Sequence, residues 1–220
     1  MRLTEEERRR VEERVAAFEA HTGAQVVTAV VERCDHYPEI PWKAFALGAS
    51  VAALVRVIVD FARPDWLTSG AALVDAIVIL GCGAVLALAS VTARPIARVF
   101  LHAARAEAEV LAHAWSLFLR HEVFATPQRN GVLILVSRFE RRMAVVMDTA
   151  LRERVENSEL HAVIAHMTRL LAQGQACDAL CDGVSHVEAL LVTKGFRAGG
   201  GEANLLSDEI IEEGPEGRRD

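Results

Sequence analysis

The sequence predicts an α/β fold in which a small mixed sheet is flanked by helices and carries an inserted transmembrane hairpin of two helices. Residues 132–136 form a continuous run of aliphatic side chains, which is typical of a strand buried on both faces. Residues 44–62 and 71–93 are two apolar stretches, each close to the ~20 residues that a helix needs to cross a bilayer. Amphipathic helical patterns precede and follow the strands, so helices are expected to flank the sheet.

The composition separates charged parts of the chain from very apolar parts. The 220 residues include 24 Lys and Arg against 30 Asp and Glu, and the formal net charge of −6 argues against a nucleic-acid partner. Hydrophobic residues make up 52% of the chain, and most of them lie away from the charged segments. The four cysteines form no Cys-x-x-Cys pair, which favours a reducing compartment over a disulfide framework.

Residues 1–42 are expected to supply the first helix and the first strand of the sheet domain. Thr4 and Glu7 have the spacing of a capping box at the start of a helix, and Gly23 suits the left-handed position after its end. Residues 24–31 are predicted to form a strand of the same buried type as residues 132–136, and residues 34–41 contain two prolines that predict a loop. The residues after Met1 are mostly charged, so no signal peptide is expected.

Residues 43–93 are predicted to form the transmembrane hairpin. Trp42 and Trp66 bracket the first apolar stretch, as aromatic anchors at a membrane interface do. The alternative is a buried helical hairpin in a soluble protein, but two such lengths in succession exceed normal core helices.

Three charged residues interrupt the apolar stretches. Arg56 and Asp60 are four residues apart on one helical face, and Asp75 is in the second stretch at a similar depth. Arg56 is expected to pair with Asp75 across the hairpin or with Asp60 along its own helix. These charges predict a structural ion pair inside the membrane rather than an ion or proton pathway.

Basic residues predict the orientation of the hairpin. Lys43, Arg94, Arg98 and Arg105 flank its open end, whereas the connecting loop offers Arg63 alone. By the positive-inside rule, both chain termini should face the cytoplasm. The predicted location is therefore the inner (plasma) membrane, with two spans.

Residues 94–195 should complete the sheet domain. A long amphipathic helix over 96–121, with Leu111 on its inner stripe, connects the first strand to the second, which favours a parallel pair. The expected elements after it are strands at 132–136 and 143–147 joined by a polar turn, a helix capped by Ser158 and ending near Gly174, and a helix over 175–194. Residues 196–220 are expected to form a flexible acidic tail.

Several short motifs share their order with a known family. They are Thr22-Gly23-Ala24-Gln25-Val26-Val27, Tyr37-Pro38, Trp115-x-x-Phe118, Arg129-Asn130-Gly131 with the strand up to Ser137, Glu140-Arg141-Arg142, and a strand that ends at Asp148. With the hairpin set aside, residues 5–195 resemble the TPM domain, named after a thylakoid phosphatase-like protein, a photosystem repair factor and a nematode receptor modulator. The resemblance is to bacterial members with a membrane hairpin at this place, and it implies an α/β sandwich, a phosphatase-like label and a role in the upkeep of membrane complexes.

The sequence offers weak candidates for phosphate chemistry. Asp148 follows an apolar strand, as the carboxylate nucleophile of an aspartyl-phosphate site does. The acid expected two residues later is replaced by Ala150, and Arg141 and Arg142, which could clamp a phosphate, lie at the opposite end of that strand. Catalysis through Asp148 is therefore less favoured than a capping or structural role.

The sequence also offers candidate metal ligands, although a solvated helix face is the favoured interpretation. Asp178, Asp182 and His186 recur every four residues on one helical face and could ligate a metal, but a solvated helix face has the same pattern. His161 and His166 on the preceding helix do not share a face. No cofactor is expected.

Taken together, the sequence favours a non-enzymatic accessory factor that is anchored in the lipid bilayer and binds a membrane protein complex. The alternative is a membrane-tethered phosphatase-like hydrolase. A concave site that contains Asp148, Arg142 and another titratable group would favour the hydrolase, whereas an apolar surface would favour the partner protein.

Overall fold

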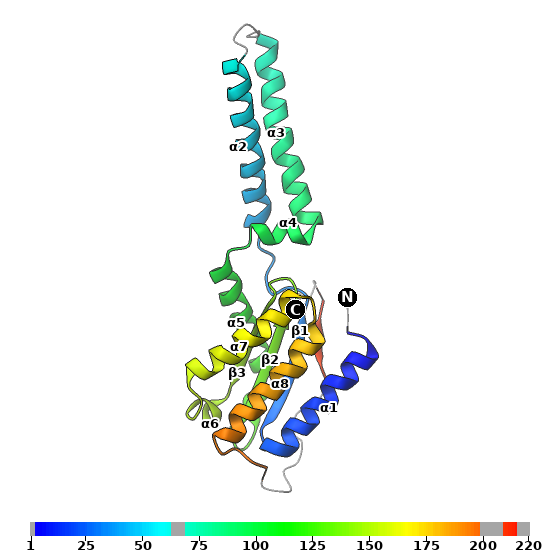
Figure 1. The fold of residues 1–220 in the computed structure, drawn as a ribbon, viewed down its shortest axis with the longest axis vertical. Helices are drawn as coiled ribbons and strands as arrows, with labels where there is room; N and C mark the ends of the chain where they lie inside the picture. Colours follow the sequence, from blue (N-terminus) through cyan, green and yellow to red (C-terminus); the bar gives the residue numbers. More distant parts are fainter. Residues whose placement is uncertain (1–2, 63–68, 199–208, 215–220) are drawn as a thin grey trace. The chain divides into compact units, whose positions relative to one another are not determined.

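The computed structural model describes residues 3–62, 69–198 and 209–214. The chain divides into two compact units, one formed by Met1–Asp35 with Ala104–Asp220 and the other by His36–Ala103. The first unit contains the sheet and the second contains two long apolar helices (Figure 1). The predicted fold class, an α/β domain with an inserted helical hairpin, is confirmed.

The sheet is mixed and has four strands in the order β3-β2-β1-β4. Its strands are β1 (Gln25–Val31), β2 (Gly131–Ser137), β3 (Arg142–Met147) and β4 (Ile211–Glu213). β1 pairs in parallel with β2 and with β4, whereas β2 and β3 form the predicted antiparallel hairpin. The central strands are buried along their whole length, as their continuous aliphatic runs require.

Helices cover both faces of the sheet. α1 (Glu5–Thr22), α7 (Asn157–Ala172) and α8 (Ala176–Thr193) lie side by side over one face (Figure 1), where the alternate residues Met143, Val145 and Met147 of β3 enter the larger core. α5 (Ala103–Arg120) packs on the other face of the sheet, against the intervening β3 residues Ala144 and Val146. Because successive side chains of a strand point to opposite faces of the sheet, each strand contributes residues to both hydrophobic cores.

Two of the predicted helix ends are confirmed and one is wrong. Thr4 and Glu7 form the capping box of α1, and Gly23 follows with a φ of 67°. The predicted cap of α7, Ser158, lies inside the helix, because Glu156 is its N-cap and forms a capping box with Glu159. A carboxylate at the N-cap accepts the same amide hydrogen bonds that a serine hydroxyl would accept.

The predicted continuous helix over 96–121 is divided. α4 (Arg94–Val99) begins with Pro95 in its first turn, and the chain leaves helical geometry after Phe100 before α5 starts. Within α5, Leu111 is 45% exposed, whereas the buried stripe contains residues such as Val110 and Leu117. The assignment of Leu111 to the inner stripe was wrong.

The second unit contains the two apolar helices α2 (Glu39–Ala62) and α3 (Ser69–Thr92). Pro41, predicted to block a helix, lies in the first turn of α2, where no intrahelical amide bond is lost. The helices approach closely at Gly48, where an added Cβ would lie 2.8 Å from the Cys82 carbonyl oxygen. Both helices are long and apolar enough to cross a membrane, and few of their residues are buried.

The prediction of an unstructured tail is wrong for residues 209–214. Ile211–Glu213 form β4, which extends the sheet beside β1, and the amide of Glu32 donates to the carbonyl of Glu213 at 3.1 Å. The Glu213 carboxylate also accepts from Nε2 of the buried His113 and from Arg120, each at 2.8 Å. These contacts with α5 give a short acidic segment enough partners to form a strand. The predicted glycine joint at 199–201 lies outside the described residues.

The β4 contacts should weaken in acid. The hydrogen bond from His113 is the largest influence that lowers the pKa of Glu213, and Arg120 adds to it against the effect of burial. A carboxyl whose pKa is depressed on folding stabilises the native state above its ordinary value of about 4.3, and this contribution is lost as the pH falls through the depressed value. We expect hydrogen-exchange protection of the Glu32 amide, corrected for intrinsic rates, to decline below about pH 4.3. In Glu213→Gln the protection should be lower at neutral pH and nearly independent of pH, and an unchanged acid profile in this variant would contradict the assignment.

Candidate functional site

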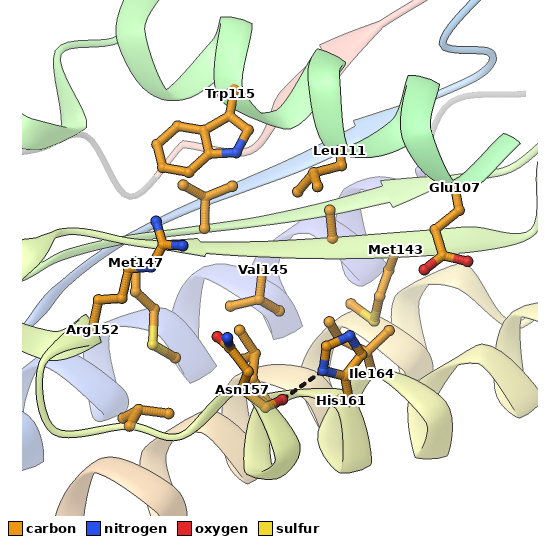
Figure 2. Close-up of a pocket in the computed structure, with 14 residues that line it drawn as sticks. Glu107, Leu111, Trp115, Met143, Val145, Met147, Arg152, Asn157, His161 and Ile164 are labelled. Carbon is orange, nitrogen blue, oxygen red and sulfur yellow. Dashed lines mark hydrogen bonds between the residues drawn. The ribbon is translucent and has the colours of Figure 1, made fainter. Parts of the chain in front are cut away.

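A groove of about 220 Å³ runs along the outer edge of β3. α5 forms one wall, the start of α7 forms the other, and the strand is the floor (Figure 2). The lining side chains are mainly apolar, and the residues are Glu107, Leu111, Trp115, Met143, Ala144, Val145, Val146, Met147, Arg152, Val155, Asn157, Leu160, His161 and Ile164.

The backbone of β3 is available along the floor of the groove. The amide of Asp148 donates to the Gly131 carbonyl at 2.9 Å. This bond identifies the hydrogen-bonded residue pairs of the antiparallel ladder between β2 and β3. Because these pairs alternate with non-hydrogen-bonded pairs, Met143, Val145 and Met147 direct their N–H and C=O groups away from β2. Among the described residues, no strand pairs with this edge.

The walls combine apolar surface with a few polar groups. Leu111 and Trp115, one helical turn apart on α5, reach toward the strand edge, and Ile164 reaches toward it from α7 (Figure 2). On α7, Nδ1 of His161 donates to the carbonyl of Asn157 at 2.6 Å, so its Nε2 is the nitrogen left with a lone pair in the neutral ring.

Opposite charges lie near the two ends of the groove. Glu107 of α5 lies near Met143, where its carboxylate is 3.3 Å from Arg142, and Arg152 lies near Met147 (Figure 2). A chain segment laid along β3 would therefore pass from the Glu107–Arg142 ion pair to Arg152.

Asp148 lies outside the groove lining and is held in a capping position. It is the N-cap of α6 (Thr149–Arg152), and its Oδ1 accepts from the Thr149 amide at 2.7 Å. Its side chain is 3% exposed, and Arg129 Nε lies 3.0 Å from Oδ2. This geometry is that of a structural carboxylate at a helix N-terminus.

The two candidate phosphate-binding arginines are not brought to Asp148. Arg142 begins β3 and Asp148 follows its last residue, so a whole strand separates them. Arg142 pairs with Glu107, and Arg141 is exposed in the turn with a φ of 51°. Among the described residues, the structure therefore does not bring Asp148 together with Arg141 or Arg142, as the predicted phosphate site required.

The thiols of the sheet unit also lack the features of a nucleophile. Burial raises the pKa of Cys34 far above its ordinary value, and Glu140 adds to this effect. Burial, together with Cys181, raises the pKa of the Cys177 thiol to about 11. A reactive cysteine needs a lowered pKa, so neither thiol is activated for attack on an ester.

We expect Asp148→Asn to leave the fold nearly intact and to abolish no phosphate-ester hydrolysis. Asparagine caps a helix about as well as aspartate, and the partner Arg129 is half exposed, so the lost ion pair should cost about 1 kcal/mol or less. The matched variant Asp148→Ala also loses the cap, which typically costs about 1 kcal/mol more. Urea unfolding and phosphate release from a generic ester measure the two effects. Turnover in the wild type that disappears in folded Asp148→Asn would show that Asp148 is catalytic.

The predicted metal-ligand set is rearranged in the structure. Asp178 pairs with Arg10 at 3.2 Å, whereas Asp182 and His186 lie beside His166 of α7. One possible ligand atom from each of these three residues lies within 4.8 Å of the other two. From the sequence, His166 was considered only together with His161 of its own helix, because the contact between two helices cannot be seen from the spacing within one of them.

The three charges of the apolar hairpin meet in one cluster. Arg56 pairs with Asp60 along α2 at 2.6 Å and with Asp75 across to α3 at 2.8 Å. Both of the pairings considered from the sequence are present together, and the Arg56–Asp75 pair links the two helices.

The groove itself was not predicted, although parts of it were visible in the sequence. Leu111 and Trp115 are four residues apart, and they form a second apolar stripe beside the buried one. This second stripe was the sequence pattern from which an apolar groove wall could have been predicted. Its position at the edge of β3 depends on the packing of three segments that are distant in the chain.

Comparisons with known proteins agree with this fold. The TPM domain family matches residues 88–190, from the end of α3 into α8, so α1 and β1 lie outside the matched part. The NMR structure of the BA42 protein from the psychrophilic bacterium Bizionia argentinensis aligns over 96% of each chain with a TM-score of 0.57 and 13% identity, which shows a shared fold alone. A search of curated proteins gave no match. The chain therefore contains a match to the TPM domain over residues 88–190 and shares its fold with the BA42 protein.

Proposed function

We propose that this protein is a membrane-anchored accessory factor that binds an extended segment of a partner protein along the outer edge of β3. The observation that carries the proposal is the free strand edge between two apolar walls. An extended segment can add to such an edge through main-chain hydrogen bonds, and its alternate side chains then fill the walls.

Three outward-facing residues of β3 set the geometry of the bound segment. Met143, Val145 and Met147 each offer one N–H and one C=O, spaced two residues apart, and a paired strand places complementary groups at the same spacing. Every second side chain of that segment would lie toward Leu111 and Trp115 of α5, and the others toward Ile164 of α7. The volume of about 220 Å³ is below the ~300–1,000 Å³ typical of small-molecule sites, which favours a strand over a compact ligand.

The apolar helices support a membrane location. α2 and α3 have the length and composition of membrane spans and expose many large apolar side chains, which water would not favour. Lys43, Arg94 and Arg98 at the ends of this hairpin favour a cytoplasmic position for both termini. We therefore propose that the hairpin holds the sheet domain at the cytoplasmic surface of the bacterial inner membrane, beside the complex that it serves.

The proposal predicts that a charge in the groove wall removes the partner. Leu111→Arg adds a charge on the wall of the groove. An apolar side chain of the partner that binds there would have to displace water from this charge, which is unfavourable. The matched control Leu119→Arg changes another exposed leucine of the same helix that does not line the groove. Both variants should fold, since both leucines are at least 45% exposed.

Co-purification from detergent extracts tests this prediction. Proteins that accompany the wild type and Leu119→Arg, but are lost at least tenfold from Leu111→Arg, are the expected result. The same set of proteins with both variants would show that the groove does not bind the partner.

A further inference from the structure

We propose that His166, Asp182 and His186 form a binding site for a first-row transition-metal dication such as Zn²⁺ or Co²⁺. The three residues lie where α7 and α8 pack together, and one possible ligand atom from each lies within 4.8 Å of the others. None of them lines the groove, so the site does not depend on the proposed function.

The ligand distances are close to those around a bound ion. Zn²⁺ binds imidazole nitrogen and carboxylate oxygen at about 2.0–2.2 Å, so two ligand atoms of a tetrahedral ion are about 3.4 Å apart. Nε2 of His166 lies 3.2 Å from Oδ2 of Asp182, which is this spacing. The three side chains are partly exposed and can rotate to close the remaining distance, and water can complete the coordination shell.

The Asp182 carboxylate is a second indication of a ligand. Its Oδ2 is shielded from solvent, yet it accepts no hydrogen bond, although nitrogens of His166 and His186 lie 3.2 and 3.4 Å away. The nearby ring N–H groups make no hydrogen bond of normal geometry with this oxygen, so a cation bound between it and the two rings would satisfy its charge better.

The hydrogen bonds of the histidines define which nitrogens are available. Nδ1 of His186 lies 2.9 Å from the Asp182 carbonyl, which can only accept, so Nδ1 carries the proton and Nε2 has the lone pair. A backbone carbonyl on the second ring nitrogen is the usual support of a metal-bound histidine. Two imidazoles with one carboxylate suit Zn²⁺ or Co²⁺, whereas Ca²⁺ and Mg²⁺ prefer oxygen ligands.

Arg169 opposes metal binding in the geometry described. Its guanidinium lies 2.9 Å from Nδ1 of His166, and because arginine only donates, this bond leaves the proton of the neutral ring on Nε2. A metal on Nε2 requires that proton to move to Nδ1, so the exposed Arg169 must withdraw. Removal of Arg169 should therefore strengthen metal binding, an effect that a plain surface cluster would not show.

The test is a titration of the detergent-solubilised full-length protein, purified without a polyhistidine tag, with Co²⁺. Visible d–d absorption reports coordination, and displacement by Zn²⁺ gives the relative affinity. We expect one Co²⁺ per chain, at least tenfold weaker binding in His166→Gln, His186→Gln and Asp182→Asn, and tighter binding in Arg169→Gln. The matched control is His161→Gln on the exposed side of α7, which should bind like the wild type.

Each other outcome overturns the proposal. No saturable Co²⁺ or Zn²⁺ binding by the wild type would show that the cluster is an ordinary polar surface. Equal loss of binding in His161→Gln would show that the ion binds elsewhere. Far-UV circular dichroism of every variant separates loss of a ligand from loss of the fold.

Discussion

Arg56→Met is expected to destabilise the hairpin by about 3–5 kcal/mol in a lipid bilayer, because it leaves two carboxylates without their cation. Arg56 contacts Asp60 at 2.6 Å and Asp75 at 2.8 Å, and all three side chains are less than half exposed before any lipid is added. In water, the same exposed ion pairs would contribute only about 0–1 kcal/mol each. The size of the effect therefore reports whether lipid surrounds the cluster.

Denaturant unfolding of the protein reconstituted in bicelles measures this effect. The triple variant Arg56→Met, Asp60→Leu, Asp75→Leu is the control, because it removes the whole cluster and leaves no unpaired charge. It should recover most of the stability that Arg56→Met loses. A loss below about 1 kcal/mol in Arg56→Met would indicate that water, not lipid, surrounds these charges.

Gly131→Ala should destabilise the sheet domain by about 3 kcal/mol. Gly131 begins β2, the strand between β1 and β3, and a Cβ there would overlap the carbonyl oxygen of Val123 and lie 2.8 Å from its Cγ1. Val123 belongs to the 3₁₀ turn Val123–Ala125, and its backbone cannot rotate away as a side chain can. The chain must therefore separate β2 from this turn.

Gly183→Ala is the matched control in the same domain. A Cβ at Gly183 would overlap only the terminal methyl of Met167, which can change rotamer, so the cost should be about 1 kcal/mol. Urea unfolding followed by circular dichroism compares the two variants. Equal stability of Gly131→Ala and Gly183→Ala would show that the turn at Val123 yields, and that its position does not limit the residue at 131.

Much of the sheet could be predicted because its strands carry their own signal. Residues 132–136 are aliphatic without interruption and residues 24–31 are mostly so, and the helix between them predicted a parallel pair, which is the observed arrangement. β4 could not be predicted, because a strand of three residues with two glutamates has almost no signal of its own. Its formation depends on the edge of β1 and on His113 and Arg120, which are distant in sequence.

The candidate sites were harder to predict for the same reason. The groove needs Leu111 on a wall, and the apolar pattern of α5 alone does not show that this residue faces the edge of β3 rather than the buried core. The metal-ligand set needs His166 from one helix beside Asp182 from another, and periodicity within a helix does not reveal that contact. Asp148 was placed correctly at the end of a strand, and its capping role follows from the helix that starts beside it.

Photo-crosslinking in intact membranes tests the central claim, that the outer edge of β3 binds an extended segment. Benzoylphenylalanine would replace Leu111 on α5 or Ile164 on α7, the two walls of the groove, and Leu119 or Ala165 as controls on the same helices outside it. We predict that both wall positions capture one partner at a single stretch of its chain, at residues separated by an odd number of positions, and that the control positions do not. Capture at the controls as efficient as at the walls, or wall positions that capture nothing, would contradict the account.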